Sequence, residues 1–184
     1  MTTLTASTTT LDNLQAAFNG ESNASARYAE FAKKAEAEGY LAVASLFRAG
    51  SKAEEIHARN HAEVIRKMGA EPKAVIETTV VKATADNLLA AIDGEVYERD
   101  VMYPEFIKNA KQNKEASAIR TFTFALKTEA EHARLYTYAA KHLEQMRAAK
   151  TWYVCQVCGY TVEMLNFLKC LVCGHSKNDY VSIK

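Results

Sequence analysis

Two Glu-x-x-His motifs stand out as residues that could do chemistry. They are Glu54 with His57, and Glu129 with His132. Residues three apart on an α-helix lie on one face, so each motif would present a carboxylate and an imidazole side by side. Neutral imidazoles and carboxylates together are ligands for transition metals. A pair of such motifs therefore predicts a metal site between two helices.

Two further glutamates, Glu21 and Glu95, occupy equivalent positions in two other predicted helices. Any one of these charges could instead belong to a solvated helix surface. However, Leu14, Ala17 and Glu21 follow one another at helical spacings, so the carboxylate continues an apolar stripe. A carboxylate that faces a core is costly unless it is paired or bound to metal. One Glu from each of two helices plus Glu-x-x-His from two others is the pattern of a di-iron or di-manganese site in a ferritin-like four-helix bundle.

Three other side chains belong with this set. Glu98 is an additional ligand candidate. Tyr28 lies nearly at the helical angle of Glu21, and Tyr103 stands likewise to Glu95, so both tyrosines are candidates for hydrogen bonds to the ligands. Buried tyrosine at helical spacing is otherwise ordinary core. We interpret His61, one turn after His57, as a structural residue outside the ligand set.

All four cysteines lie near the C-terminus, in two Cys-x-x-Cys pairs: Cys155 with Cys158, and Cys170 with Cys173. In a cytosolic chain such pairs indicate a metal site rather than disulfides. Four thiolates suit a tetrahedral iron or zinc ion, and a structural zinc ribbon is the alternative to a redox-active iron site. His175 follows closely, but four sulfurs already complete the coordination.

An internal repeat indicates how the helices position these groups. Residues 12–21 resemble 86–95, and residues 28–59 resemble 103–134, which suggests a duplicated helical hairpin. We predict helices over the following ranges: 11–38, 40–68, 86–112 and 115–147. Residues 69–85 would form a crossover, as in ferritin-like bundles. The second half holds one extra residue between Glu95 and Tyr103, which a π-bulge would absorb, and Pro104 would weaken regular helical bonding there.

Length and composition allow one domain and a small module. The chain has 184 residues, of which 48% are hydrophobic, and its 23 basic and 22 acidic residues leave a net charge of +1. This balance gives no general attraction to nucleic acid or to membranes. No apolar run approaches the roughly 18 residues that span a bilayer, so we expect a cytoplasmic protein. We place the helical domain at 1–150, with a disordered tail at 1–10, and the cysteine module at 151–184.

Taken together, these motifs resemble the rubrerythrin family over essentially the whole chain, in family order. The resemblance implies an all-α ferritin-like four-helix bundle followed by a rubredoxin-like module. It also implies that Glu54 and Glu129 bridge two irons and that Glu21 and Glu95 are terminal ligands. His132 would bind the second iron. On the first iron, Glu98 would exchange for His57 as the centre is reduced.

The resemblance further implies a peroxidase that reduces hydrogen peroxide to water in oxidative stress defence. The four-cysteine iron would pass on electrons from rubredoxin or an NAD(P)H-dependent reductase. Family members form homodimers, and the crossover is long enough to let hairpins exchange between subunits. Family members often have a proline at the position of Leu171 and a slightly longer gap between the two cysteine pairs. Both differences bear on the redox tuning of the four-cysteine site. The alternative function is iron oxidation and storage with a structural zinc ribbon.

Overall fold

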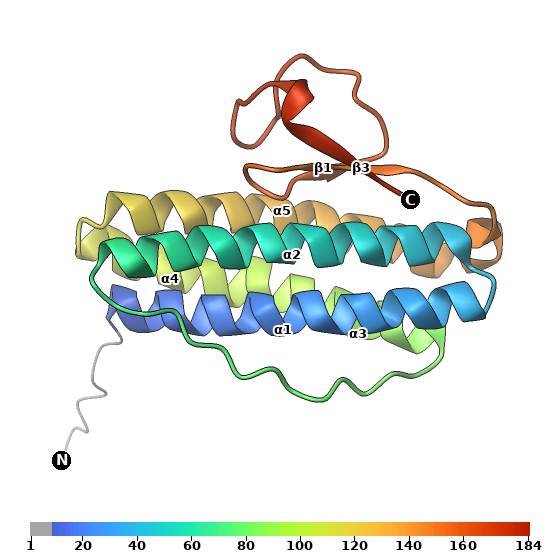
Figure 1. The fold of residues 1–184 in the computed structure, drawn as a ribbon, viewed down its shortest axis with the longest axis horizontal. Coiled ribbons are helices and arrows are strands. Elements are labelled where there is room, and N and C mark those ends of the chain that lie inside the picture. Colours follow the sequence, from blue (N-terminus) through green and yellow to red (C-terminus); the bar gives the residue numbers. More distant parts are fainter. Residues whose placement is uncertain (1–8) are drawn as a thin grey trace.

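The structure, a computed structural model, describes residues 9–184 as a long helical bundle with a small sheet packed against one side (Figure 1). The helices are α1 (Thr10–Ala37), α2 (Leu41–Lys67), α3 (Thr84–Tyr97), α4 (Tyr103–Gln112) and α5 (Ala116–Lys141). A π-helical segment, Glu98–Met102, joins α3 to α4, so these three elements form one of four bundle helices. The predicted four-helix bundle and its π-bulge are confirmed.

The ends of α1 follow from local chemistry. Thr9 caps the helix by accepting a hydrogen bond from the amide of Asp12, whose carboxylate bonds back to the amide of Thr9. Gly39 has φ +80°, a conformation that suits glycine in the turn to α2. Of the expected tail at 1–10, residues 1–8 lie outside the described residues. Thr10 is already buried in the first turn of α1.

The last predicted helix is shorter than expected. The sequence predicts a helix over 115–147, but α5 ends at Lys141 and a separate 3₁₀ turn covers Leu143–Arg147. This tighter turn buries Met146 in the core and places the guanidinium of Arg147 4.4 Å from the ring centre of Tyr40. The prediction was wrong here because contacts with the α1–α2 end of the bundle outweigh helix propensity.

The crossover runs in an extended conformation beside α1 (Figure 1). Amide side chains spaced by four residues along α1 accept hydrogen bonds from backbone N–H groups spaced by two along the crossover. The pairs are Gln15 with Lys73 at 3.1 Å, Asn19 with Val75 at 2.8 Å and Asn23 with Glu77 at 2.8 Å. Four helical residues rise about 6.0 Å and two extended residues about 6.6 Å. The two spacings match, so one helix face holds the crossover in register.

The sheet shares the core of the bundle. Its strands are β1 (Trp152–Cys155), β2 (Thr161–Val162) and β3 (Tyr180–Ile183), all antiparallel, with β1 in the centre. Trp152 is 1% exposed, and its indole N–H points at the carbonyl of Ala42 on α2 at 3.4 Å. The module therefore lies firmly on α2 and α5. Among residues 9–184, the helices are too short or too polar to cross a membrane.

Candidate metal centres

Six acidic and imidazole side chains meet in the middle of the bundle, and each is at most 1% exposed. They come from α1, α2, α3 and α5: Glu21, Glu54, His57, Glu95, Glu129 and His132. They form two overlapping groups whose potential ligand atoms all lie within 4.8 Å of one another. The first group contains Glu21 and His57, the second contains Glu95 and His132, and both contain Glu54 and Glu129.

The two shared glutamates face both histidines. Nδ1 of His57 lies 2.8 Å from Oε2 of Glu54 and 3.0 Å from Oε1 of Glu129. Nδ1 of His132 lies 3.2 Å from the other oxygen of Glu54 and 3.1 Å from the other oxygen of Glu129. Each shared carboxylate thus directs one oxygen toward each half of the cluster. This is the arrangement that a carboxylate needs to bridge two cations.

Most of the potential ligand atoms at the centre have no hydrogen-bond partner of suitable geometry among residues 9–184. They include both oxygens of Glu54 and of Glu129, one oxygen each of Glu21 and Glu95, and Nδ1 of both histidines. Buried polar atoms are otherwise almost always hydrogen-bonded. Their convergence is explained by a dinuclear metal site with oxygen and nitrogen ligands, which these residues fit.

Electrostatics in the cluster lead to the same conclusion. Burial, together with the carboxylate of Glu54, raises the pKa of Glu21 well above its usual range and that of Glu95 to about 8. Burial alone would lower the pKa of His57 and His132, but Glu129 and Glu54 raise both pKa values. The protein thus holds protons among the closely packed carboxylates and imidazoles. Cations bound there would displace those protons.

Hydroxyl and imidazole groups complete the surroundings. Tyr28 donates a 2.6 Å hydrogen bond to Oε1 of Glu95, and Tyr103 donates to Oε1 of Glu21. His61 lies behind Tyr103, with Nε2 3.1 Å from its hydroxyl and Nδ1 3.0 Å from Oγ1 of Thr121. Burial and the nearby His57 lower the pKa of His61 to about 3. His61 is therefore neutral and supports Tyr103 from outside the cluster.

Glu98 is the one predicted ligand that belongs to neither group. It begins the π-helical segment and is half-buried. Burial, together with Glu21 and Glu95, raises the pKa of its carboxyl well above the usual range. Its charge thus interacts with the cluster, although its oxygens are not among the converging donors.

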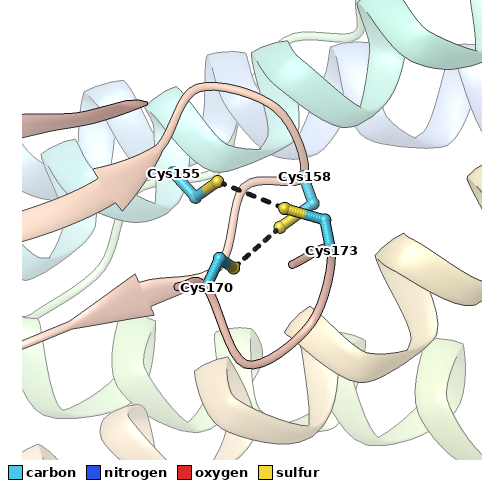
Figure 2. Close-up of side chains that lie close together, drawn as sticks. All are labelled: Cys155, Cys158, Cys170 and Cys173. Atoms are coloured by element: carbon cyan, nitrogen blue, oxygen red, sulfur yellow. Dashed lines mark hydrogen bonds between the residues drawn. The ribbon is translucent and has the colours of Figure 1, made fainter. Parts of the chain in front are cut away.

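The four cysteines form a second group (Figure 2). Cys155 ends β1, Cys158 lies on the loop between β1 and β2, and Cys170 and Cys173 lie on the loop before β3. Sγ of Cys155 lies 3.7 Å from Sγ of Cys173, and Sγ of Cys158 lies 3.6 Å from Sγ of Cys170. A tetrahedral ion with metal–sulfur bonds of about 2.3 Å separates its sulfurs by about 3.8 Å. All four thiols are free, so the group fits one tetrahedral ion.

The cysteine module touches the carboxylate cluster directly. Nε2 of His57 lies 3.0 Å from the carbonyl oxygen of Cys158, and Nε2 of His132 lies 3.1 Å from Oγ1 of Thr161. The sequence did not suggest either contact. A backbone carbonyl carries no sequence signal, and a threonine after Cys-Gly-Tyr has many structural uses.

Comparison with known proteins agrees with this geometry. The family model described as rubrerythrin matches residues 12–140. The chain belongs to the rubrerythrin family. Rubrerythrin-2 of Clostridium acetobutylicum is 36% identical over 176 residues, covering 93% of this chain and 95% of that protein. Nigerythrin of Nitratidesulfovibrio vulgaris is 34% identical over 180 residues, covering 97% of this chain and 88% of the relative.

Solved structures extend the likeness to the fold. A structure described as the fully reduced, all-ferrous state of nigerythrin has a TM-score of 0.88 and 33% identity. It covers 97% of this chain and 89% of its own. The predicted architecture, a ferritin-like bundle followed by a rubredoxin-like four-cysteine module, is thereby confirmed for this rubrerythrin-family chain.

Proposed function

We propose that this chain is a non-haem di-iron peroxidase that reduces hydrogen peroxide to water in oxidative stress defence. The observation that carries the proposal is the pair of overlapping ligand groups that share Glu54 and Glu129. Membership of the rubrerythrin family supports an oxidoreductase. The similar nigerythrin structure described as all ferrous supports iron as the metal.

The ligand assignment follows the two groups. Glu54 and Glu129 would bridge the ions, because each directs one oxygen to each side. Glu21 with His57 would complete one side. Glu95 with His132 would complete the other side in the same way.

Glu98 is proposed as a ligand that replaces His57 when the centre is oxidised. A π-helical turn widens the helix locally and shifts side chains relative to a regular α-helix. Glu98 begins such a turn, and its raised pKa shows that it interacts with Glu21 and Glu95. We therefore propose that this side chain moves to the cluster when the centre is oxidised.

A pair of ferrous ions held here would supply two electrons at once, and hydrogen peroxide needs two electrons and two protons to become two waters. The residues around the cluster control the protons. Tyr28 holds its hydroxyl proton at Oε1 of Glu95, and Tyr103 holds its proton at Oε1 of Glu21. Because all six ligands are at most 1% exposed, the bundle also excludes bulk water from the site.

The four-cysteine site is proposed to bind iron and relay single electrons. Cys158 connects the two centres, because its sulfur belongs to the thiolate group and its carbonyl oxygen lies 3.0 Å from His57. The proposed donors are rubredoxin or an NAD(P)H-dependent reductase. Four free thiols in this pattern favour the cytoplasm, where thiols stay reduced. The proposed assembly is a homodimer.

The test is an anaerobic absorption experiment on natively purified protein. Thiolate-to-iron charge-transfer bands should bleach on reduction and return when peroxide is added. Glu98→Ala should lower peroxide turnover sharply, whereas Asp93→Ala, an exposed acidic residue on α3, should leave it unchanged. Wild-type turnover by Glu98→Ala would contradict the role of Glu98. A colourless, zinc-loaded module would contradict the relay.

Assembly size separates this proposal from iron storage. Storage requires a hollow shell of many subunits, whereas peroxide reduction requires no shell. Gel filtration with light scattering should give a dimer. A large shell that accumulates iron would favour the storage function and a structural zinc in the cysteine module.

A further inference from the structure

The Nε2 atoms of both cluster histidines, His57 and His132, form hydrogen bonds with one short loop of the cysteine module. This loop, residues 155–161, is called the first knuckle below. His57 lies against the carbonyl of Cys158, and His132 lies against the hydroxyl of Thr161. His57, His132, Cys158 and Thr161 are all at most 1% exposed. The first knuckle therefore forms one wall of the carboxylate–histidine cluster.

The directions of these hydrogen bonds fix the tautomer of each histidine. A carbonyl oxygen can only accept, so Nε2 of His57 carries the proton that faces Cys158. The Thr161 hydroxyl donates to the carbonyl of Gly159 at 3.0 Å, and it therefore accepts the Nε2 proton of His132. When a cation displaces the second ring proton, the lone pair of each neutral ring is therefore on Nδ1. That is the nitrogen that faces the shared glutamates.

The fit of the first knuckle against His57 is close. Gly159 has φ +81°, and a Cβ at this position would lie 2.6 Å from Nε2 of His57. Thr128 on α5 donates to the same Cys158 carbonyl at 3.1 Å. The amide of Asn60 on α2 donates to the neighbouring carbonyl of Val157 at 2.8 Å. A small shift of the first knuckle would thus move an acceptor away from a histidine.

The conformation of this loop depends in turn on the thiolate site. Cys155 and Cys158 supply two of its four sulfurs, and the amide of Gly159 donates to the carbonyl of Cys155 at 2.8 Å. An ion bound to the four sulfurs would tie the first knuckle to Cys170 and Cys173. It would therefore restrict the same backbone that orients His57.

We propose that metal binding at the four-cysteine site and metal binding at the carboxylate–histidine cluster are positively coupled through the first knuckle, with Thr161 as the positioning residue for His132. This proposal rests on the ligand assignment above but not on peroxide chemistry. Losing an outer hydrogen-bond partner of a metal ligand typically lowers metal affinity about 10- to 100-fold. Coupling of binding free energies is reciprocal, so each site should strengthen the other.

The test uses Co²⁺ as the probe with the full-length, metal-free protein. Cobalt bound by thiolates gives intense charge-transfer bands, and cobalt bound by carboxylate and imidazole gives weak visible bands, so the two sites can be followed separately. One equivalent of thiophilic Cd²⁺ first fills the four-cysteine site. The cluster of this protein should bind Co²⁺ about tenfold more tightly than the cluster of the double variant Cys170→Ser, Cys173→Ser. Equal affinities would overturn the proposal.

A second pair of variants tests Thr161 without touching a cysteine. In the Cd²⁺-loaded protein, Thr161→Val should weaken Co²⁺ binding at the cluster about tenfold, and Thr161→Ser should restore it because the hydroxyl is kept. In the double cysteine variant, Thr161→Val should lower the Co²⁺ affinity of the cluster by less than tenfold, since the first knuckle is already free to move. Equal effects of valine and serine would refute the role of Thr161. Far-UV circular dichroism identifies any variant that fails to fold.

These outcomes are independent of the proposed activity. A protein without peroxide turnover can still show coupled Co²⁺ binding, in which case only the peroxidase function fails. A protein with normal turnover and uncoupled Co²⁺ binding would disprove the coupling alone.

Discussion

Tyr28 on α1 donates a 2.6 Å hydrogen bond to Oε1 of Glu95 on α3, and Tyr103 at the start of α4 donates to Glu21 on α1. Each tyrosine thus donates its hydrogen bond to the glutamate from the other half of the repeat. Each tyrosine follows the glutamate of its own half by seven or eight residues, about 10–12 Å along the axis, which a hydroxyl does not span. The duplicated hairpin therefore produces two reciprocal cross-links at the heart of the bundle.

The first prediction concerns these cross-links. Tyr28→Phe should lower iron affinity at the cluster about tenfold, because Glu95 loses the donor that orients it. Anaerobic Fe²⁺ titration and peroxide turnover measure the effect. Tyr40→Phe is a matched control, since Tyr40 donates a 2.9 Å hydrogen bond to Glu144 on the surface. Equal effects of the two variants would contradict the role of Tyr28.

The second prediction concerns pH. In the metal-free protein, burial and Glu54 raise the pKa of Glu95 from 4.5 to about 8. The folded state then binds more protons than the unfolded state. The contribution of Glu95 to the free energy of unfolding is therefore complete below pH 4.5, and it is lost as pH rises through 8. Glu21 and both histidines, whose pKa values are also raised, act in the same direction.

Urea unfolding of the metal-free protein should therefore show stability falling by a few kcal/mol between pH 6 and about pH 9. Bound metal replaces the protons, so the stability of the metal-loaded protein should fall much less over the same pH range. Glu95→Gln should make the metal-free profile less steep, because an amide does not titrate, while Glu21 and the histidines keep part of the slope. A metal-free profile that rises over this range would contradict the assigned pKa directions.

Much of the fold could be predicted because the sequence contains the same helical hairpin pattern twice. Two copies of one helical hairpin, with a ligand glutamate and a Glu-x-x-His in each, predicted four helices and a central cluster. The single extra residue before Tyr103 predicted the π-helical segment at Glu98–Met102. Periodicity reports which face of a helix is buried. It was sufficient to select the six side chains that meet in the cluster, whereas the seventh candidate, Glu98, belongs to neither group.

The remaining features depend on contacts between distant parts of the chain. The end of the last helix at Lys141 follows from the packing of Met146 and Arg147, which periodicity does not report. The bonds from His57 to the Cys158 carbonyl and from His132 to Thr161 join the two modules. Such bonds use a backbone atom and a common hydroxyl, so only the three-dimensional arrangement reveals them.

The third prediction concerns the amide ladder on α1. Asn19→Ala removes the acceptor of the Val75 amide, and Asn23→Ala removes that of the Glu77 amide. One hydrogen bond contributes roughly 1 kcal/mol, so hydrogen exchange at each freed amide should accelerate about fivefold. Gln112→Ala, at an exposed site on α4, is the control. Unchanged exchange at Val75 in Asn19→Ala would argue against the ladder.

The fourth prediction compares two helical glycines. At Gly50 on α2 a Cβ would overlap the hydroxyl of Tyr136 and lie 3.3 Å from Cδ2 of Tyr28. At Gly20 on α1 it would meet no atom of the described part of the chain within 4 Å. Alanine is favoured over glycine in helices by up to about 1 kcal/mol, so Gly20→Ala should stabilise the fold. Gly50→Ala should destabilise it by about 1–3 kcal/mol, because overpacking forces Tyr136 from its place.

Displacement of Tyr136 should also disturb Tyr28, whose ring centre lies 5.5 Å from that of Tyr136. Gly50→Ala should consequently weaken Fe²⁺ binding through the hydrogen bond from Tyr28 to Glu95, while Gly20→Ala should leave it unchanged. Urea midpoints and Fe²⁺ titrations of the two variants measure both effects. If Gly50→Ala were as stable as Gly20→Ala, the close approach of Tyr136 to α2 would be wrong.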